Sequence, residues 1–110
     1  HVNAHGTGTP LNDPAEAAAL QQVFHRPPPV TANKSVIGHT MGAAGAIEAA
    51  IAVLSLQHRL VPPTANLDRL DDAVDLDVVT KVPRPLTVPT ALSVSSGFGG
   101  QNAAVVLTAA

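Results

Sequence analysis

The sequence contains no cysteine, no tryptophan and no tyrosine. Without cysteine the chain has neither a disulfide framework nor a thiolate metal site, which is compatible with a cytoplasmic protein. Two phenylalanines are the only aromatic residues, so any core must be packed with alanine, valine, leucine and isoleucine. We therefore expect an interior of closely packed helices and strands.

Charged residues are also scarce, at 13% of the 110 residues, and the net charge is −2. No basic cluster is present that would hold a nucleic-acid backbone, and we expect no nucleic-acid partner. The longest apolar run, residues 45–57, contains Glu48, and its uncharged part is far shorter than the roughly 20 residues of a membrane span. We expect a buried core helix there and no membrane association.

The length fits one folding unit, residues 1–110, and no internal repeat divides it. The prolines at 27–29 and 62–63 mark connections within this unit. The chain begins without methionine and without a signal-peptide pattern, so its start resembles a cut through a longer protein.

Helix and strand signals alternate along the chain. A short strand over 1–5 leads into a Gly-Thr-Gly-Thr loop, and Asp13 is expected to cap a helix over 14–24, with Glu16 completing a capping box. The remaining expected elements are a strand over 30–33, a helix over 42–58, a strand from about Ala91, a Gly-Phe-Gly-Gly turn and a strand over 103–108. This alternation predicts an α/β layered fold.

Two histidines stand beside glycine-containing turns. His5 could act as a general acid or base, although a single histidine beside glycine is more often structural. His1 and His5 have the spacing of helical zinc ligands, but the segment between them is expected to be a strand, so we expect no transition-metal site. The Gly-Thr alternation after His5 lacks the spacing of nucleotide-binding loops.

His39 stands just before the second predicted helix, where the positive end of the helix dipole disfavours the imidazolium. A neutral ring at this place can donate a hydrogen bond to a developing oxyanion. Lys34 could hold an acidic partner, for which Glu16 and Asp13 are candidates, or it could be solvated. Glu48 requires a hydrogen-bond or cation partner if it is buried.

Four sequence blocks occur in order: VNAHGTGTP, NKSVIGHTMGAAGAIEA, PPTANLD and SSGFGGQN. Together they resemble the C-terminal part of the β-ketoacyl synthases of fatty-acid and polyketide synthesis, over essentially the whole chain. The resemblance implies a thiolase-like fold, in which two pseudo-symmetric halves form a layered α-β-α-β-α sandwich, usually in a homodimer or a ketosynthase heterodimer. Only a portion of the C-terminal half would be present here.

The resemblance also implies a decarboxylative Claisen condensation that requires no cofactor. An acyl chain on an active-site cysteine is attacked by the carbanion formed from malonyl, which acyl carrier protein presents on its phosphopantetheine arm. That cysteine belongs to the N-terminal half of such enzymes. This chain alone is therefore expected to be inactive in condensation.

Individual positions acquire roles through the resemblance. His5 and His39 match the two active-site histidines, and Lys34 matches the family lysine, with its carboxylate partner expected at Glu16 and with Asp13 nearby. The pantetheine-binding threonines are matched by Thr7 and Thr9, and the gating phenylalanine by Phe98. Some members bind a structural sodium or potassium ion at the positions of Asn3, Glu48 and Ser93.

Two functional interpretations remain open. The chain is either the histidine-bearing part of an active synthase, or part of a non-condensing relative, such as a chain-length factor or a decarboxylase, that keeps the fold without the cysteine. The presence of both histidines favours the first interpretation. In either case we expect unpaired sheet edges and marginal stability for the chain in isolation.

Overall fold

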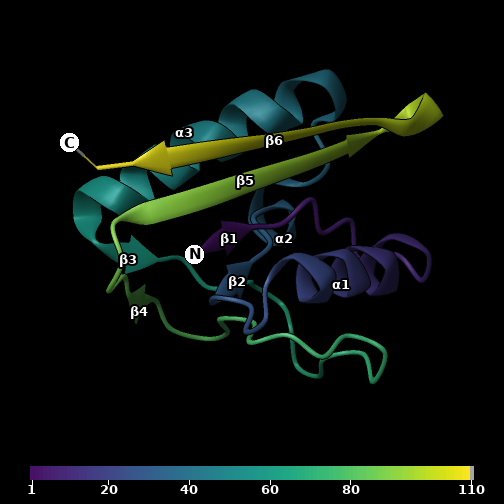
Figure 1. Ribbon diagram of the computed structural model, residues 1–110, viewed down its shortest axis with the longest axis horizontal. Coiled ribbons are helices and arrows are strands. Elements are labelled where there is room, and N and C mark those ends of the chain that lie inside the picture. Colours follow the sequence, from purple (N-terminus) through teal and green to yellow (C-terminus); the bar gives the residue numbers. More distant parts are fainter. Residues whose placement is uncertain (110) are drawn as a thin grey trace.

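The computed structural model describes residues 1–109 as a mixed sheet with helices on both faces (Figure 1). The sheet has the strand order β2-β1-β5-β6. Strand β1 pairs in parallel with β2 and β5, whereas β5 and β6 form an antiparallel hairpin. The strands are β1 (Val2–Asn3), β2 (Val30–Thr31), β5 (Thr90–Gly97) and β6 (Gln101–Thr108).

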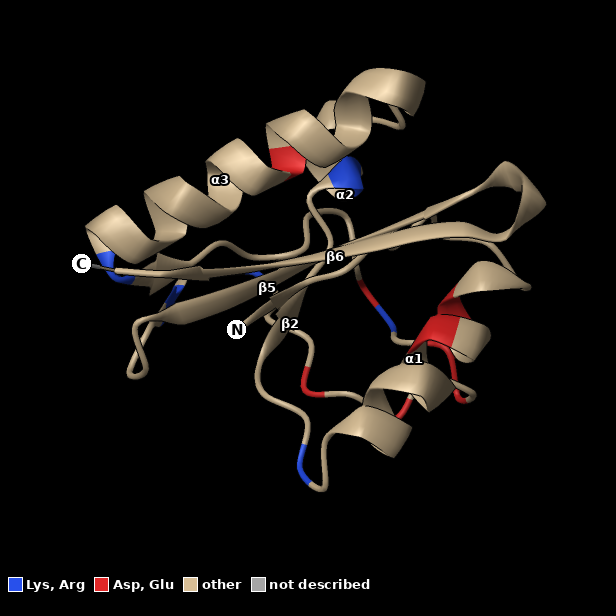
Figure 2. Ribbon diagram, turned by 45° about the horizontal axis from the view of Figure 1, so that its top comes forward, with Lys and Arg blue, Asp and Glu red and all other residues tan. Residues whose placement is uncertain are grey.

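Two longer helices cover opposite faces of this sheet. Figure 2 shows helix α3 (Ala44–His58) on one side of the strands and helix α1 (Asn12–Val23) on the other. The helices and the hairpin were predicted with bounds that differ by a few residues, and the α/β layered fold is confirmed.

Several short elements were not predicted, because they are too short to carry a hydrophobic period. The strand expected over 30–33 ends at Thr31, since the chain turns directly into a one-turn helix. The unpredicted elements are α2 (Lys34–Ile37), β3 (Leu60–Val61) and β4 (Arg84–Pro85). Two 3-10 turns, Met41–Ala43 and Phe98–Gly100, lie at the start of the helix expected over 42–58 and at the expected Gly-Phe-Gly-Gly turn.

Strand β5 contributes to a separate small core on each face of the sheet. Ala91 packs with Ala52 and Leu56 of α3, while Leu92 and Val94 pack against the cluster on the α1 side. This alternation follows from the two-residue period of a strand. It turns the intervening serines of β5 toward α3.

Helix α3 faces the sheet with a stripe of buried residues four positions apart. Ala44, Glu48 and Ala52 are all buried, and Glu48 is 0% exposed. The stretch from Met41 to His58 is long and apolar enough by composition to cross a membrane. The helix packs against β5 and buries the carboxylate of Glu48, but only 28% of the stretch is buried, so it covers the sheet with one face and leaves the other face exposed.

The predicted capping box at the start of α1 is wrong. The helix begins at Asn12, whose backbone N–H donates to Thr9 Oγ1 over 3.3 Å, while the Asp13 N–H donates to the Thr9 carbonyl over 3.2 Å. Thr9 therefore accepts from the first two amides of the helix, Leu11 stands directly before it without a side-chain cap, and the carboxylates of Asp13 and Glu16 bind backbone amides of the preceding loop. Thr9-Pro10 and Asp13-Pro14 are both cap-proline pairs, so local pattern alone did not distinguish them.

The hairpin leaves apolar surface exposed within residues 1–109. There, β6 pairs with β5 alone, and its Val105 and Val106 are 46% and 66% exposed. Open edges and apolar faces of this kind lower stability and promote association. We expect the isolated chain to melt near or below room temperature in a far-UV circular dichroism scan. A cooperative transition well above room temperature would contradict this expectation.

Candidate active site

His5 follows β1 in a tight turn that only glycine can make. Gly6 has φ +44°, and a Cβ built there would lie 2.6 Å from the Cβ of Ala32. One carboxylate fixes this turn: Glu16 accepts the His5 N–H at Oε1 over 2.7 Å and the Gly6 N–H at Oε2 over 2.9 Å. Glu16 is thus used by the turn itself, as a support for the backbone of His5.

Lys34, on α2, pairs with Glu48 across a distance of 2.5 Å between Nζ and Oε1. Both side chains are buried, at 5% and 0% exposure. The ammonium also donates to the His5 carbonyl over 2.6 Å and lies 3.4 Å from His5 Nδ1. The predicted pairing of Lys34 with Glu16 or Asp13 is therefore wrong, because the buried stripe of α3 presents Glu48 to the lysine instead.

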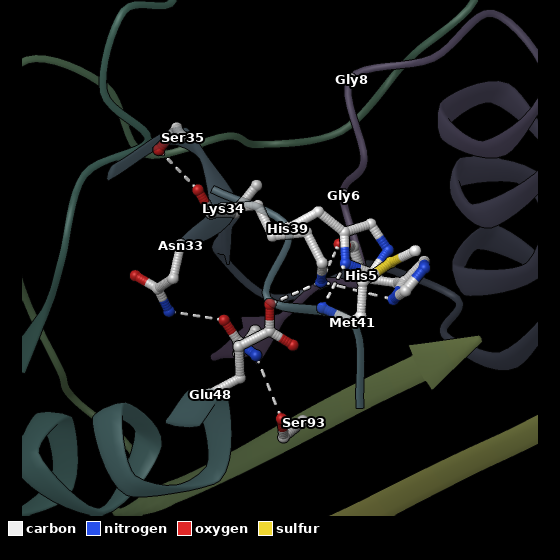
Figure 3. A network of polar contacts seen from close by, with 12 residues as sticks. His5, Gly6, Gly8, Asn33, Lys34, Ser35, His39, Met41, Glu48 and Ser93 are labelled. Atoms are coloured by element: carbon white, nitrogen blue, oxygen red, sulfur yellow. Dashed lines mark hydrogen bonds and ion pairs between the residues drawn. The ribbon is translucent and has the colours of Figure 1, made fainter. Parts of the chain in front are cut away.

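His39 lies just before the helical stretch that leads into α3. Its Nδ1 accepts the backbone N–H of Met41 over 3.1 Å. Met41 has φ +52°, a left-handed conformation that is uncommon for a side chain of this size. The rings of His5 and His39 lie 5.5 Å apart between centroids with an interplanar angle of 84° (Figure 3). The structure thus brings His5, Lys34 and His39 into one cluster.

The contacts at Nδ1 define the tautomer of both histidines. A backbone amide and a lysine ammonium can only donate, so each Nδ1 must accept. A neutral imidazole carries one N–H, which must then be at Nε2 in both rings. The cluster therefore offers two Nε2–H donors from adjacent rings.

Burial lowers the pKa of His5 below its ordinary value of 6.5. The positive charge of Lys34 and the neighbouring His39 lower it further, whereas Glu16 and Glu48 oppose the shift. His5 is 6% exposed, which agrees with the dominant effect of desolvation. The ring is accordingly held in its neutral form.

An open cavity of about 670 Å³ lies beside this cluster, between the loop after His5 and the segment 64–78. Thr7, Thr9, Lys34 and His39 are among its lining residues. The hydroxyl groups of the two threonines are 2.8 Å apart and hydrogen-bonded to each other. The structure places both threonines on the cavity that His39 reaches.

Phe98 does not lie on that cavity. It occupies the tip of the β5–β6 hairpin and is 93% exposed. Gly99 and Gly100, with φ +73° and +78°, form the turn there. The structure therefore separates Phe98 from the histidine cluster in this chain.

Of the three residues matched to a cation site, Asn3 and Ser93 are hydrogen-bonded to each other, and Glu48 is a buried carboxylate. Asn3 donates from Nδ2 to Ser93 Oγ over 3.0 Å and accepts at Oδ1 from Asn33 over 2.5 Å. Among the described residues, Glu48 Oε2 is buried without a hydrogen-bond partner. Figure 3 shows Glu48 with Asn33 and Ser93. A cation fits this site because one carboxylate oxygen is free to bind it.

Two residues that contribute contacts to the site were not predicted from the sequence. Asn33 joins β1 to α2 through Asn3, and Met41 orients His39. Their only sequence signal is their place within the block NKSVIGHTMGAAGAIEA. Neither residue type indicates these tasks, which depend on backbone conformation and on distant partners.

Residues 1–68 match the family described as "Beta-ketoacyl synthase, C-terminal domain". The chain is 48% identical over 106 residues to the 3-oxoacyl-[acyl-carrier-protein] synthase 2 of Mycobacterium leprae (strain TN), covering 96% of this chain and 25% of that protein. It thus spans about a quarter of the length of this curated relative.

Solved structures give the same result. The ishigamide ketosynthase/chain length factor matches with a TM-score of 0.95 and 40% identity, covering 99% of this chain and 27% of that one. A type II polyketide synthase acyl-carrier protein in complex with its ketosynthase matches with a TM-score of 0.93 and 34% identity, covering 99% and 28%. The fold is that of a fragment of a thiolase-like ketosynthase, and the chain belongs to the β-ketoacyl synthase family, as part of its C-terminal domain.

Proposed function

We propose that this chain forms the histidine- and lysine-bearing part of the active site of a synthase that condenses malonyl on acyl carrier protein with an acyl thioester. The pair of Nε2–H donors on His5 and His39 is the observation that carries this proposal. Two neutral donors on adjacent rings suit the oxygen of an enolate, on which negative charge develops during decarboxylation.

The reaction begins at the malonyl thioester. The bond between C2 and the carboxylate carbon breaks, carbon dioxide leaves, and the electron pair moves onto the thioester oxygen as an enolate. The Nε2–H groups of His5 and His39 donate to that oxygen. The enolate carbon then attacks the acyl thioester and expels its thiolate. Because the chain has no cysteine, the thiol that holds the acyl group comes from outside it.

Lys34 acts as a positioning residue in this proposal. Its ammonium group binds the His5 carbonyl and Glu48, and it places a positive charge beside His5 Nδ1. Burial disfavours the imidazolium most, and the charge of Lys34 adds to this effect, so the pKa of His5 is lowered and the ring stays a neutral donor.

The phosphopantetheine arm of acyl carrier protein would enter the cavity beside the histidines. The hydroxyls of Thr7 and Thr9 line this cavity and can hydrogen-bond the amides of the arm. The ketosynthase structure with its acyl-carrier protein supports this partner. Phe98 would gate the acyl pocket once the remainder of a synthase, including its N-terminal half and dimer partner, surrounds the hairpin tip.

The test uses the completed synthase, in which this chain is joined to the preceding part of the Mycobacterium leprae relative. We expect it to release carbon dioxide from malonyl on acyl carrier protein and to extend an acyl thioester. A folded completed synthase that does neither would refute the proposal. The ishigamide ketosynthase/chain length factor supports the alternative, a non-condensing partner, which would instead associate with an active ketosynthase.

The titration of His5 follows from its environment. Its pKa is lowered from 6.5, so between the folded pKa and 6.5 only the unfolded state binds the proton. The contribution of His5 to the free energy of unfolding should therefore fall as the pH drops below 6.5 and level off below the folded pKa. We expect NMR of the completed synthase to show His5 titrating below 6.5. Titration of His5 at or above 6.5 would contradict this.

We also propose that Asn3, Glu48 and Ser93 hold a sodium or potassium ion, with Glu48 Oε2 as the charged ligand. An ion that binds only the folded state raises stability with concentration. The melting temperature of the completed synthase should be higher in potassium chloride than in choline chloride of equal ionic strength. A smaller difference is expected for Ser93→Ala, and identical melting in both salts would exclude the ion.

A further inference from the structure

We propose that the segment from Thr64 to Asn66 positions Lys34 and, through it, His5. This inference rests on the function proposed for the same site. The segment belongs to the block PPTANLD, whose side chains take no part in the reaction described above. Three contacts of the segment with the chain around Lys34 carry the inference.

Lys34 stands on a helix too short to hold its own position. Helix α2 has four residues, and a single turn is not stable by itself in water. The ammonium nevertheless reaches three groups, among them the buried carboxylate of Glu48 and the carbonyl of His5. The backbone on either side of Lys34 must therefore be fixed from outside the helix.

The segment bonds the chain on both sides of Lys34. Before the lysine, the Ala32 N–H donates to Thr64 Oγ1 over 3.0 Å. After the lysine, Ser35 Oγ accepts the backbone N–H of Ala65 over 2.9 Å. Asn66 Nδ2 donates to the Ser35 carbonyl over 3.2 Å. Ser35 Oγ also donates to the Ala32 carbonyl over 2.6 Å, which ties the two attachment points together.

The segment is itself attached to the central sheet. The Thr64 N–H donates to the Val79 carbonyl over 2.7 Å, and the Val79 N–H donates to the Val30 carbonyl of β2 over 2.9 Å. Asn66 has φ +55°, a conformation that asparagine adopts more readily than most residues. That backbone conformation presents its amide to Ser35. The segment from Thr64 to Asn66 is therefore attached to the central sheet by backbone hydrogen bonds.

A contact from β1 completes the arrangement. Asn33, next to Lys34, donates from Nδ2 to Oδ1 of Asn3 in β1. Helix α2 is thus held between β1 and the segment. Removing the Thr64 hydroxyl leaves the Ala32 N–H without its acceptor and frees one attachment point. We expect the backbone around Lys34 to be held less firmly and the lysine to move away from His5.

The chain offers a matched control for this experiment. Thr31 is 0% exposed, and its Oγ1 has no hydrogen-bond partner among the described residues. Thr31→Val therefore makes the same chemical change next to Ala32 without removing a bond, while Thr64→Val removes one. Thr64→Ser keeps the hydroxyl and serves as the rescue variant. Asn66→Gly keeps the left-handed backbone and removes only the exposed amide.

The variants are made in the completed synthase, and the pKa of His5 is measured by NMR. Burial lowers this pKa most, Lys34 and His39 lower it further, and Glu16 and Glu48 raise it. We expect the pKa to rise toward 6.5 in Thr64→Val, to rise less in Asn66→Gly, and to remain unchanged in Thr31→Val and Thr64→Ser. In parallel, kcat for decarboxylation should fall about tenfold in Thr64→Val while KM changes less than about twofold.

The inference is overturned if folded Thr64→Val and Asn66→Gly keep the pKa of His5 and kcat of the parent. It is also overturned if Thr31→Val changes them as much as Thr64→Val does. Should Thr64→Val fail to fold, the milder Asn66→Gly decides by the same two measurements. A completed synthase without any decarboxylation would refute the proposed function, and the titration of His5 would still test the positioning of Lys34.

Discussion

Replacing His39 by alanine in the completed synthase should slow decarboxylation of malonyl on acyl carrier protein about 100-fold to 1000-fold, the loss typical of one oxyanion donor. The exposed ring of His39 touches the chain through Nδ1, so its Nε2–H is free for the enolate oxygen. Because the loss concerns charge that develops in the transition state, kcat should fall and KM should change little. Rates of carbon dioxide release over a range of malonyl concentrations provide the measurement.

Two further variants distinguish the loss of the hydrogen-bond donor from a general effect of substitution on the protein. His39→Gln keeps an N–H near the position of Nε2 and should retain more activity than His39→Ala. His25→Ala removes an exposed histidine outside the cluster and should leave the rate unchanged. A loss of less than about threefold in a folded His39→Ala protein would contradict a role for this ring as an oxyanion donor.

Replacing Glu48 by leucine should destabilise the protein by about 3–5 kcal/mol, because it leaves the buried ammonium of Lys34 without its counter-charge. A well-packed apolar pair of similar volume is often as stable as a buried ion pair. The double variant Lys34→Met with Glu48→Leu should therefore recover much of the lost stability. Denaturant unfolding of the parent, the single variant and the double variant measures both changes.

The same double variant tests whether Lys34 acts on His5. Without the ammonium, His5 Nδ1 and the His5 carbonyl lose their donor. We expect the double variant to be stable but about tenfold or more slower in decarboxylation, with a raised pKa of His5. Full activity in the stable double variant would show that the ion pair has a purely structural role.

For the stability measurement, a loss of less than about 1 kcal/mol in the free energy of unfolding of Glu48→Leu would show that the pair is not buried in solution.

Local pattern predicted most of the regular structure. The helix expected over 42–58 is found as a 3-10 turn followed by α3, and the hairpin surrounds the Gly-Phe-Gly-Gly turn. These elements are long enough to show a period, and glycine marks their ends. Helix α2 and strands β3 and β4 were missed, because two to four residues show no period.

The sequence predicted which residues belong to the candidate site, but it did not predict the contacts between them. His5, Lys34 and His39 were identified through the sequence blocks, and the structure brings them together. The partner of the lysine was assigned to α1, whereas the structure pairs it with Glu48. The capping prediction at Asp13 failed for a related reason, since Thr9-Pro10 and Asp13-Pro14 are similar pairs four residues apart and the first helical amides bind Thr9.

The sequence by itself determined the α/β class, the longer helices and strands, the absence of a thiol and the identity of the residues that can carry chemistry. These properties depend on residue type and on spacing along the chain. Only the tertiary structure decided which carboxylate meets Lys34, which amide fixes the tautomer of His39, and that Phe98 lies away from the cavity. The physical reason is that Asp13, Glu16 and Glu48 carry the same functional group, and only the packing of α3 against the sheet distinguishes them.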